Sequence, residues 1–390
     1  MKKAIIVGGG TGGHIIPAIV VAQELDKRGY DLKWIGSNKS KILEKKIINN
    51  YFNRIKIYHI PSGKLRRKKN ILLTIFNLQN ILDIFQFLFG IIASIFILIK
   101  ERPSFIFSKG GFVSVPVAVA SKLLKIPFYT HESDYTVGLA NKINLYFSRK
   151  FFYSFKDTLK ELPSQKSVFS SNPVRNEFFI DYFDIKNNAN DIEIDEDLNK
   201  FLKSKDNNLP LILVLGGSLG SLKINQIIYE ILPKLCEKYC IIHQTGENKE
   251  IEFKHPNYFQ VSFISKGISY CMKNSNLIIS RSGANLVFEI VATKTPAIFI
   301  PLKSASRGEQ YNNAKYFEQK STSYIVIDED KVDSLSLLNT IDKLIAISKD
   351  KFKTIDSSSD KKENDIEFDE LKIRAEKVII DTIENDLLIK

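Results

Sequence analysis

The sequence predicts an α/β protein made of two similar halves, each built on a doubly wound, mostly parallel sheet. Three observations favour this fold class. Short apolar runs typical of buried strands alternate with segments of helical periodicity along the chain. A polar stretch at Asp181–Asn208, which we expect to be a loop, interrupts the alternation, which then restarts. Each half also opens with an apolar strand, a glycine-rich turn and a helix, in that order. Strands and helices that alternate in this way form parallel sheets covered by helices.

The first half contains six runs that we expect to be strands, separated by segments that we expect to be helices. The runs are short and rich in Ile, Val, Phe and Tyr, as strands buried on both faces are. The expected strands are Ala4–Val7, Leu32–Ile35, Ile55–Ile60, Phe105–Ser108, Pro127–Thr130 and Phe151–Tyr153. The expected helices are Ile15–Arg28, Ile42–Ile48, Ile71–Lys100, Val113–Leu124 and Leu139–Phe147.

The second half repeats the pattern, and a last helix is expected near the C-terminus. The expected strands are Leu211–Leu215, Ile241–Ile242, Tyr258–Val261, Leu277–Ile279, Ala297–Ile300 and Tyr324–Ile327, and the last helix is Phe368–Leu388. A chain of 390 residues is too long for one ordinary hydrophobic core. We therefore expect one domain at 1–174 and a second at 175–350, with the segment at about 367–390 packed back on the first.

The composition narrows the possible partners. A formal net charge of +12 favours phosphates, anionic lipid or nucleic acid, but no basic–aromatic motif supports nucleic acid. The 3 cysteines form no C-x-x-C pair, which favours a reducing compartment and argues against a disulfide framework or a zinc site. The first apolar run starts at Ala4, so we expect no signal peptide and a cytoplasmic location.

One apolar segment allows two interpretations. Residues Ile84–Ile99 contain no charged side chain, and Ile71–Leu82 before them is also strongly apolar. A membrane-spanning helix needs about 20 consecutive apolar residues. Because Asp83 interrupts the longer window, we favour a helix packed on the sheet and keep a spanning helix as the alternative.

Glycine-rich turns mark the candidate site. In the turn Gly8–His14 and its counterpart Gly216–Ser221, glycines let the main chain approach a ligand closely, and the helix that follows favours a phosphate at its N-terminus. Either turn could also be purely structural. His14 is a candidate general base, or a histidine that only caps or packs. His131 and Glu132, at a strand end, could line the same cleft or form a structural hydrogen bond with each other.

The second half offers a carboxylate and polar side chains at strand ends. Glu289 lies on an otherwise apolar helix after Ser280–Ala284, where it could accept from ribose hydroxyls. The segment Arg307–Ala314 opens another helix, and its polar side chains would suit sugar hydroxyls.

Taken together, these motifs resemble one known family. The chain contains GGTGGH-x-x-P, GGFVS-x-P, HE, NPVR, GGS-x-G, SRSGA-x-x-x-E and EQYNNA, in that order from Gly8 onwards. This set resembles the MurG-type undecaprenyldiphospho-muramoylpentapeptide β-N-acetylglucosaminyltransferases of peptidoglycan synthesis. The resemblance implies a GT-B fold, with two Rossmann-like domains facing across a cleft, and inverting transfer without a metal or cofactor. It implies N-acetylglucosamine transfer from UDP-N-acetylglucosamine to the C4 hydroxyl of undecaprenyl-diphospho-N-acetylmuramoyl-pentapeptide, which converts lipid I to lipid II.

The resemblance also implies roles for individual residues. It implies contact with the donor or the acceptor diphosphate for Thr11, Gly12 and Gly13, and contact with UDP for Arg175 and Ser218. Within UDP, the main chain of Ile264 would contact uracil, and Glu289 would contact the ribose. The sugar hydroxyls would be bound by Gln310 and Glu309, and His14 would accept the proton of the acceptor hydroxyl. Asp134 stands where the family often has an amide implicated in substrate contact, so it ranks below the others. Leu219 and Leu286 also replace polar residues that are common in the family.

A lipid acceptor implies contact with an anionic membrane surface, on the cytoplasmic side and without a spanning segment. The basic cluster Lys64–Lys69 directly precedes the apolar Ile71–Phe76, a combination that fits peripheral attachment, although a solvated loop before a core helix would look similar. Two other functions stay open at this point. One is a GT-B transferase with a different acceptor, and the other is a non-catalytic nucleotide-sugar-binding partner of a membrane transferase.

Overall fold

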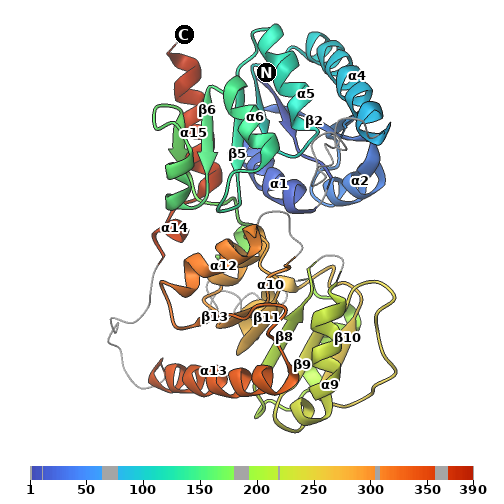
Figure 1. The fold of residues 1–390 in the computed structure, drawn as a ribbon, viewed down its shortest axis with the longest axis vertical. Coiled ribbons are helices and arrows are strands. Elements are labelled where there is room, and N and C mark those ends of the chain that lie inside the picture. Colours follow the sequence, from blue (N-terminus) through green and yellow to red (C-terminus); the bar gives the residue numbers. More distant parts are fainter. Residues whose placement is uncertain are drawn as a thin grey trace. The chain divides into compact units, whose positions relative to one another are not determined.

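The computed structural model describes residues 2–10, 12–63, 78–179, 193–217, 220–303, 308–355 and 368–389. The chain divides into two compact units, one formed by Met1–Val174 with Phe368–Lys390 and the other by Arg175–Glu367. Each unit contains one sheet with helices packed on it (Figure 1). The α/β fold class with two Rossmann-like units is therefore confirmed. Thr11, Ser218, Leu219, Arg307 and the basic cluster Lys64–Lys69 lie outside the described residues.

The sheet of the first unit has the order β3-β2-β1-β4-β5-β6-β7, and all its strand pairs are parallel. Its strands are β1 (Lys3–Val7), β2 (Asp31–Ser37), β3 (Lys56–Ile60), β4 (Phe105–Ser108), β5 (Phe128–Glu132), β6 (Lys150–Tyr153) and β7 (Ser167–Phe169). The order reverses between β1 and β4. In open parallel sheets the ligand crevice lies outside the carboxyl ends of the strands at such a switch point.

Helices cover both faces of this sheet. They are α1 (Gly12–Lys27), α2 (Lys41–Asn49), α4 (Leu78–Glu101), α5 (Ser114–Leu123), α6 (Leu139–Phe147), α14 (Asp369–Lys372) and α15 (Ala375–Leu388), with short 3₁₀ turns at Asn38–Ser40 and Lys156–Glu161. Alternate residues of β1 point to opposite faces. Ala4 and Ile6 pack with α1 and α15, whereas Ile5 and Val7 pack with α4 and α5.

Helix α15, close to the C-terminus, is fixed to the first unit by polar contacts as well as by burial. Glu384 accepts from Arg28 Nη1 at 2.6 Å and from the Tyr30 hydroxyl at 2.9 Å. Asp386 accepts from the Tyr129 hydroxyl at 2.6 Å and pairs with Arg149 at 2.8 Å. The chain therefore returns to its first unit after completing the second.

The second unit has a six-stranded parallel sheet in the order β10-β9-β8-β11-β12-β13. Its strands are β8 (Leu211–Leu215), β9 (Cys240–Gln244), β10 (Tyr258–Val261), β11 (Leu277–Ser280), β12 (Ala297–Phe299) and β13 (Tyr324–Val326). Its helices are α8 (Glu196–Ser204), α9 (Leu222–Lys238), α10 (Ile268–Asn274), α11 (Ala284–Ala292), α12 (Glu309–Glu318) and α13 (Ser334–Ile355), with a 3₁₀ turn at Asn176–Phe178. The switch point here lies between β8 and β11.

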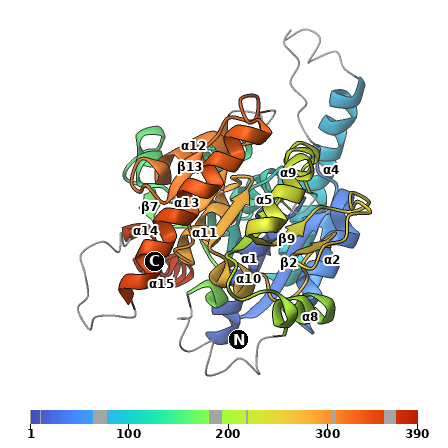
Figure 2. The same ribbon diagram turned by 90° about the horizontal axis from the view of Figure 1, so that it is seen from below.

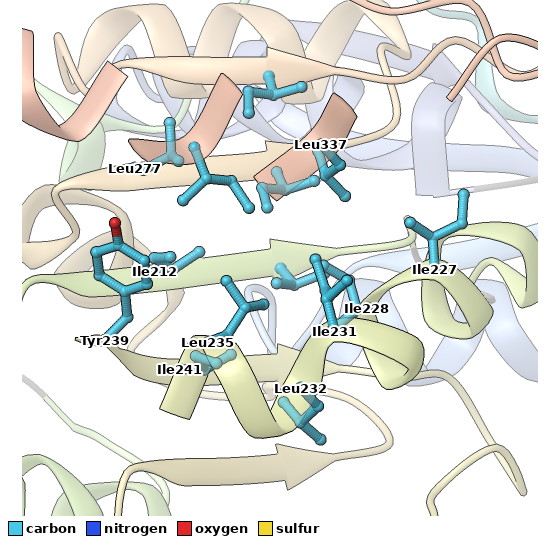
Figure 3. Close-up of a cluster of buried hydrophobic side chains, with 14 of the residues drawn as sticks. Ile212, Ile227, Ile228, Ile231, Leu232, Leu235, Tyr239, Ile241, Leu277 and Leu337 are labelled. Carbon is cyan, nitrogen blue, oxygen red and sulfur yellow. The ribbon is translucent and has the colours of Figure 1, made fainter. Parts of the chain in front are cut away.

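The core of the second unit forms between one face of this sheet and helices α9 and α13 (Figure 3). On α9 the buried residues Ile224, Ile228, Ile231 and Leu235 recur every three to four positions, so they line one face of the helix. They meet strand residues such as Ile212, and Leu337 of α13 closes the cluster. The apolar runs of the sequence therefore form the buried strands, and the helical period of α9 places its apolar side chains on one face, as predicted.

The expectation of a loop throughout Asp181–Asn208 is wrong, because α8 forms at Glu196–Ser204. Two of its residues three positions apart, Leu198 and Phe201, are buried, and the Phe201 ring stacks on Phe259 with centroids 5.5 Å apart. Acidic residues in its first turn and Lys203 in its last suit the helix dipole. Three apolar residues among many charged and polar ones were too weak a pattern to predict this short helix.

Helix α4 lies on the outside of the first unit beside α5 (Figures 1 and 2). It packs inward through Leu98 and through Gly90, where a side-chain carbon would collide with the Pro61 carbonyl oxygen and crowd the Pro116 ring. Its other face exposes large apolar side chains at Leu82, Ile84, Phe85, Leu88, Phe89, Ile92, Phe96 and Ile99. Within the described part of the chain, Leu82–Glu101 is long and apolar enough to span a membrane by length and composition, and only 22% of its most apolar window is buried. The packed face agrees with the favoured interpretation, and the exposed face was not predicted.

Candidate active site

The glycine turn of the first unit connects β1 to the N-terminus of α1. Gly10 adopts a φ of +97°, which glycine reaches without strain. Gly12 and Gly13 are the first two residues of α1, where the positive end of the helix dipole lies. A side-chain carbon added at Gly12 would meet no atom within 4 Å, so the space beside this helix start is open within the unit.

The buried carboxylate of Glu44 holds this turn in place. Its Oε1 accepts from the Gly10 amide at 3.1 Å, from the Ser37 amide at 3.1 Å and from the Ser40 hydroxyl. Its Oε2 lies 3.2 Å from His59 Nε2. Glu44 was not predicted, because it lies among lysines on α2. The one available signal is that it precedes the buried Ile48 by four residues and so shares its face of the helix.

His14 lies half-buried in the first turn of α1. Its Nδ1 is 3.2 Å from the carbonyl oxygen of Lys109. A carbonyl oxygen can only accept, so in the neutral ring Nδ1 has the proton and Nε2 has the lone pair. Gly111 leaves room beside that nitrogen, because a side-chain carbon there would lie 3.6 Å from Nε2. Burial lowers the pKa of His14, the Lys109 ammonium lowers it further, and the Asp134 carboxylate opposes them.

Lys109 follows β4 and is almost completely buried, at 2% exposure. Its ammonium donates to His131 Nδ1 at 2.7 Å and to the Ser133 hydroxyl. Burial lowers the pKa of Lys109 to about 8, against the opposing effects of Glu132 and Asp134. Lys109 was not predicted as a site residue, since a lysine at a strand end is usually solvated.

His131 and Glu132 were expected either to line the cleft or to form a hydrogen bond with each other, and the structure shows both bound to other groups. His131 Nε2 donates to the Ser171 carbonyl at 2.9 Å, while its Nδ1 accepts from Lys109. Glu132 accepts from the amides of Asp134 at 3.1 Å and Gly138 at 2.8 Å. Both side chains are buried, and Asp134 is half-buried just beyond β5.

In the second unit the structure brings together Arg175 and Glu289, the residues expected at UDP and at ribose. Arg175 Nε and Nη2 both contact Glu289 Oε1, at 3.1 and 3.0 Å. Arg175 also pairs with Glu177 at 2.9 Å and lies over the Phe178 ring at 4.8 Å. Burial raises the pKa of Glu289, and Arg175 works against that rise.

Gln310 and Ile264 take part in contacts that fix strand ends. Gln310, in the first turn of α12, accepts from the Leu302 amide at 3.0 Å, and Glu309 lies beside it, half-buried. The buried Ile264 donates its amide to Gln244 Oε1 at 3.0 Å. Gln244, which the sequence analysis missed, ends β9 and also donates to the Gly217 carbonyl at 3.1 Å. It therefore links Ile264 to the second glycine turn.

Arg281, which the motifs include without assigning a role, secures the other side of this turn. Its guanidinium donates to the Ser221 hydroxyl at 2.6 Å and to the Ile300 carbonyl at 3.1 Å, and it pairs with Glu329. Ser221 in turn caps α9 by accepting from the Ile224 amide at 3.3 Å. Among the described residues, no three His, Cys, Asp or Glu side chains are grouped to hold a metal ion.

Comparisons with known proteins connect both sites to one family. The profile of the glycosyltransferase family 28 N-terminal domain matches residues 4–153, and that of its C-terminal domain matches residues 211–368. A relative from Clostridium novyi (strain NT) is 37% identical over 360 residues, which are 92% of this chain and 94% of the relative. The chain belongs to glycosyltransferase family 28. The family 28 relative is named UDP-N-acetylglucosamine–N-acetylmuramyl-(pentapeptide) pyrophosphoryl-undecaprenol N-acetylglucosamine transferase. The MurG-type resemblance is thus confirmed.

Solved structures that are similar to this family 28 chain share its fold, but the proteins are named for different reactions. MurG from Acinetobacter baumannii matches with a TM-score of 0.66 and 19% identity over 99% of this chain and 100% of that one. UDP-GlcNAc 2-epimerase from Neisseria meningitidis matches with the same TM-score of 0.66 and 15% identity, over 98% and 100%. A GT-B-like architecture alone therefore does not choose between transfer and epimerisation. The sequence identity to the relative from Clostridium novyi, which is named as a transferase, favours transfer.

Proposed function

We propose that this enzyme transfers N-acetylglucosamine from UDP-N-acetylglucosamine to the C4 hydroxyl of undecaprenyl-diphospho-N-acetylmuramoyl-pentapeptide, converting lipid I to lipid II. The observation that supports this most strongly is the 37% identity, over nearly the whole of both chains, to a relative named for this transfer. The motifs of both units lie at the carboxyl ends of parallel strands, where ligands bind in such sheets.

In the first unit His14 is the proposed proton acceptor. Its Nδ1 is held by the Lys109 carbonyl, so Nε2 can take the proton of the acceptor hydroxyl. As that proton leaves, the hydroxyl oxygen bonds to the anomeric carbon of the donor sugar, and the bond from that carbon to the UDP oxygen breaks on the opposite side. The configuration is inverted, and the negative charge passes to the UDP leaving group.

In the second unit the Arg175–Glu289 pair is the proposed holder of UDP. Both contacts from Arg175 go to Oε1 of the carboxylate, and we assign Oε2 to the ribose hydroxyls. The same arginine would bring positive charge close to the diphosphate as it leaves. Gln310 and Glu309 are assigned to the sugar hydroxyls and the Ile264 main chain to uracil. Since the Ile264 amide is already bound to Gln244, we assign its carbonyl oxygen.

Peripheral attachment to the cytoplasmic face of the membrane completes the proposal. The exposed apolar face of α4 provides large side chains that can enter the lipid interface. The basic cluster Lys64–Lys69 precedes α4 in sequence, and it would add about 1 kcal/mol per basic residue close to anionic lipid. Binding to vesicles that contain phosphatidylglycerol should weaken as salt is raised and should persist in part, because the apolar contribution is not screened.

UDP release measured with and without a lipid I analogue tests the reaction. We expect release that requires the analogue and is absent with diacylglycerol. Release with diacylglycerol alone would assign a different acceptor. Binding of UDP-N-acetylglucosamine without any release, in the presence of the analogue, would make the chain a non-catalytic binding partner and would overturn the proposal.

A further inference from the structure

Two oppositely charged residues flank His14 at the ends of neighbouring strands. Strands β4 and β5 are paired in parallel, with Ser108 opposite Thr130. Lys109 directly follows β4, and Asp134 lies two residues beyond the end of β5. Both therefore lie at the carboxyl edge of the sheet, where β1 leads through the glycine turn to His14.

Lys109 makes two different contributions at this edge. Its carbonyl oxygen accepts from His14 Nδ1, which fixes the ring orientation and the tautomer. Its ammonium turns inward to His131 and Ser133, both neutral partners. The His131 ring cannot take up a proton in response, because its Nε2–H is bound to the Ser171 carbonyl and burial keeps its pKa well below the usual value. The ammonium is therefore a buried positive charge at the sheet edge, on the residue whose main chain holds the His14 ring.

Asp134 provides the opposing charge. Its amide donates to Glu132 Oε1, which holds the loop after β5. The charge of Glu132 is itself bound by the amides of Asp134 and Gly138 and by Asn141 Nδ2. On the other side of the glycine turn, Glu44 accepts from the Gly10 amide, and His59 lies beside Glu44. Of the charged groups on the described elements around His14, Lys109 and Asp134 act on its proton affinity.

We propose that Lys109 and Asp134 are positioning residues that act as an opposed pair of charges on His14, with Lys109 keeping the ring neutral and Asp134 limiting that effect. In this chain the pair consists of a buried lysine and of an aspartate at a position where the family often has an amide. The inference depends on the proposed function for its catalytic consequence, but the effect on His14 itself can be measured without substrate.

Removing either charge should change the pKa of His14, and the two changes should have opposite directions. Removing the Lys109 ammonium raises the pKa of His14, so a larger fraction of the ring is protonated near neutral pH and fewer rings can accept a proton. Removing the Asp134 carboxylate lowers the pKa of His14. The acid limb of kcat/KM should follow each change, moving to higher pH in the first case and to lower pH in the second.

The test is an NMR titration of the full chain labelled with ¹³C at histidine Cε1, with His14 assigned from His14→Gln among the 5 histidines. Lys109→Met and Asp134→Asn are compared with wild type, and Lys122→Met, an exposed lysine on α5, is the matched control. We expect the His14 midpoint to rise by about half a pH unit or more in Lys109→Met and to fall by a similar amount in Asp134→Asn. It should stay unchanged in Lys122→Met and return close to wild type in the double variant.

Shifts of the same sign, or no shift in either variant, would overturn the inference. If circular dichroism shows that Lys109→Met does not fold, Asp134→Asn decides alone. An unchanged His14 midpoint in Asp134→Asn would show that Asp134 does not oppose the effect of Lys109, and would overturn the inference. Failure of the proposed function is distinguished by kinetics. A folded His14→Ala enzyme with normal turnover would exclude His14 as the base and would leave the NMR shifts intact.

Discussion

Replacing Arg175 by Met should destabilise the second unit, because it leaves the Glu289 carboxylate without its cation. The two side chains are 19% and 12% exposed, so their pair is largely removed from water. Breaking a fully buried pair costs about 3–5 kcal/mol. The remaining exposure of both groups reduces this figure, and we expect a loss of about 2–3 kcal/mol in the free energy of unfolding at pH 7.

The loss should depend on pH with a definite sign. Burial already raises the pKa of Glu289 above its usual value, and Arg175 opposes that rise. Without Arg175 the folded state binds the Glu289 proton more tightly than the unfolded state does. The variant is therefore least stable relative to wild type above the folded pKa of Glu289. It should regain stability as the pH falls from about 7 towards about 4.5, where the carboxyl becomes neutral in the unfolded chain as well.

The single tryptophan makes the assay specific for one unit. Trp34 is buried in the first unit, so its fluorescence reports unfolding of that unit, whereas far-ultraviolet circular dichroism reports both. In urea titrations, Arg175→Met should shift the circular dichroism transition of the second unit and leave the Trp34 transition in place. Glu289→Gln is the matched change, and the double variant completes a thermodynamic cycle.

Two results would refute this reasoning. One is a loss in Arg175→Met below about 0.5 kcal/mol at pH 7, the size typical of an exposed pair. The other is a double variant as unstable as Arg175→Met alone, because removing the unpaired carboxylate should recover much of the loss. A coupling energy of about 1–3 kcal/mol between the two sites is expected instead.

Three further outcomes are expected. His14→Ala should lower kcat by about 10²–10⁴-fold with intact circular dichroism, as expected for loss of a general base, and normal turnover would contradict that role. Glu44→Ala should raise the KM for the lipid I analogue about 10-fold by releasing the Gly10 turn, with the KM for UDP-N-acetylglucosamine unchanged, and an equal rise for both substrates would argue against a local effect. Phe89→Glu on α4 should weaken binding to phosphatidylglycerol vesicles about 10-fold, whereas Leu388→Glu on α15, packed on the opposite face of the sheet, should not.

The sequence predicted the sheets well because parallel strands buried on both faces are recorded directly as apolar runs. The strand β7 escaped prediction since it is only three residues long, lies at the sheet edge and is half-buried. Helix α8 was not predicted because only two of its side chains are buried. Both elements depend on contacts made elsewhere in the fold, which no local pattern reports.

At the site, the sequence identified the candidate functional residues better than it identified the residues that hold them in place. Motif resemblance selected Arg175 and Glu289, and the structure adds that they bind one another. Glu44, Lys109, Gln244 and Arg281 were not assigned, because each does its work while buried. A charged or amide side chain gives no sign in sequence that it will be buried, since its burial is compensated by partners that are distant along the chain.

The two glycine turns, similar in sequence, are stabilised by opposite charges. In the first unit the carboxylate of Glu44 already occupies the Gly10 amide and places negative charge beside the turn. In the second unit Arg281 binds Ser221 beside its turn, and the carboxylate of Glu329 balances the charge of Arg281. Of the two arrangements, the first therefore opposes a diphosphate more strongly, because the energy of a charge near a partly buried site depends on the sign of its neighbours. This difference supports assigning UDP to the second unit and the reacting hydroxyl, beside His14, to the first.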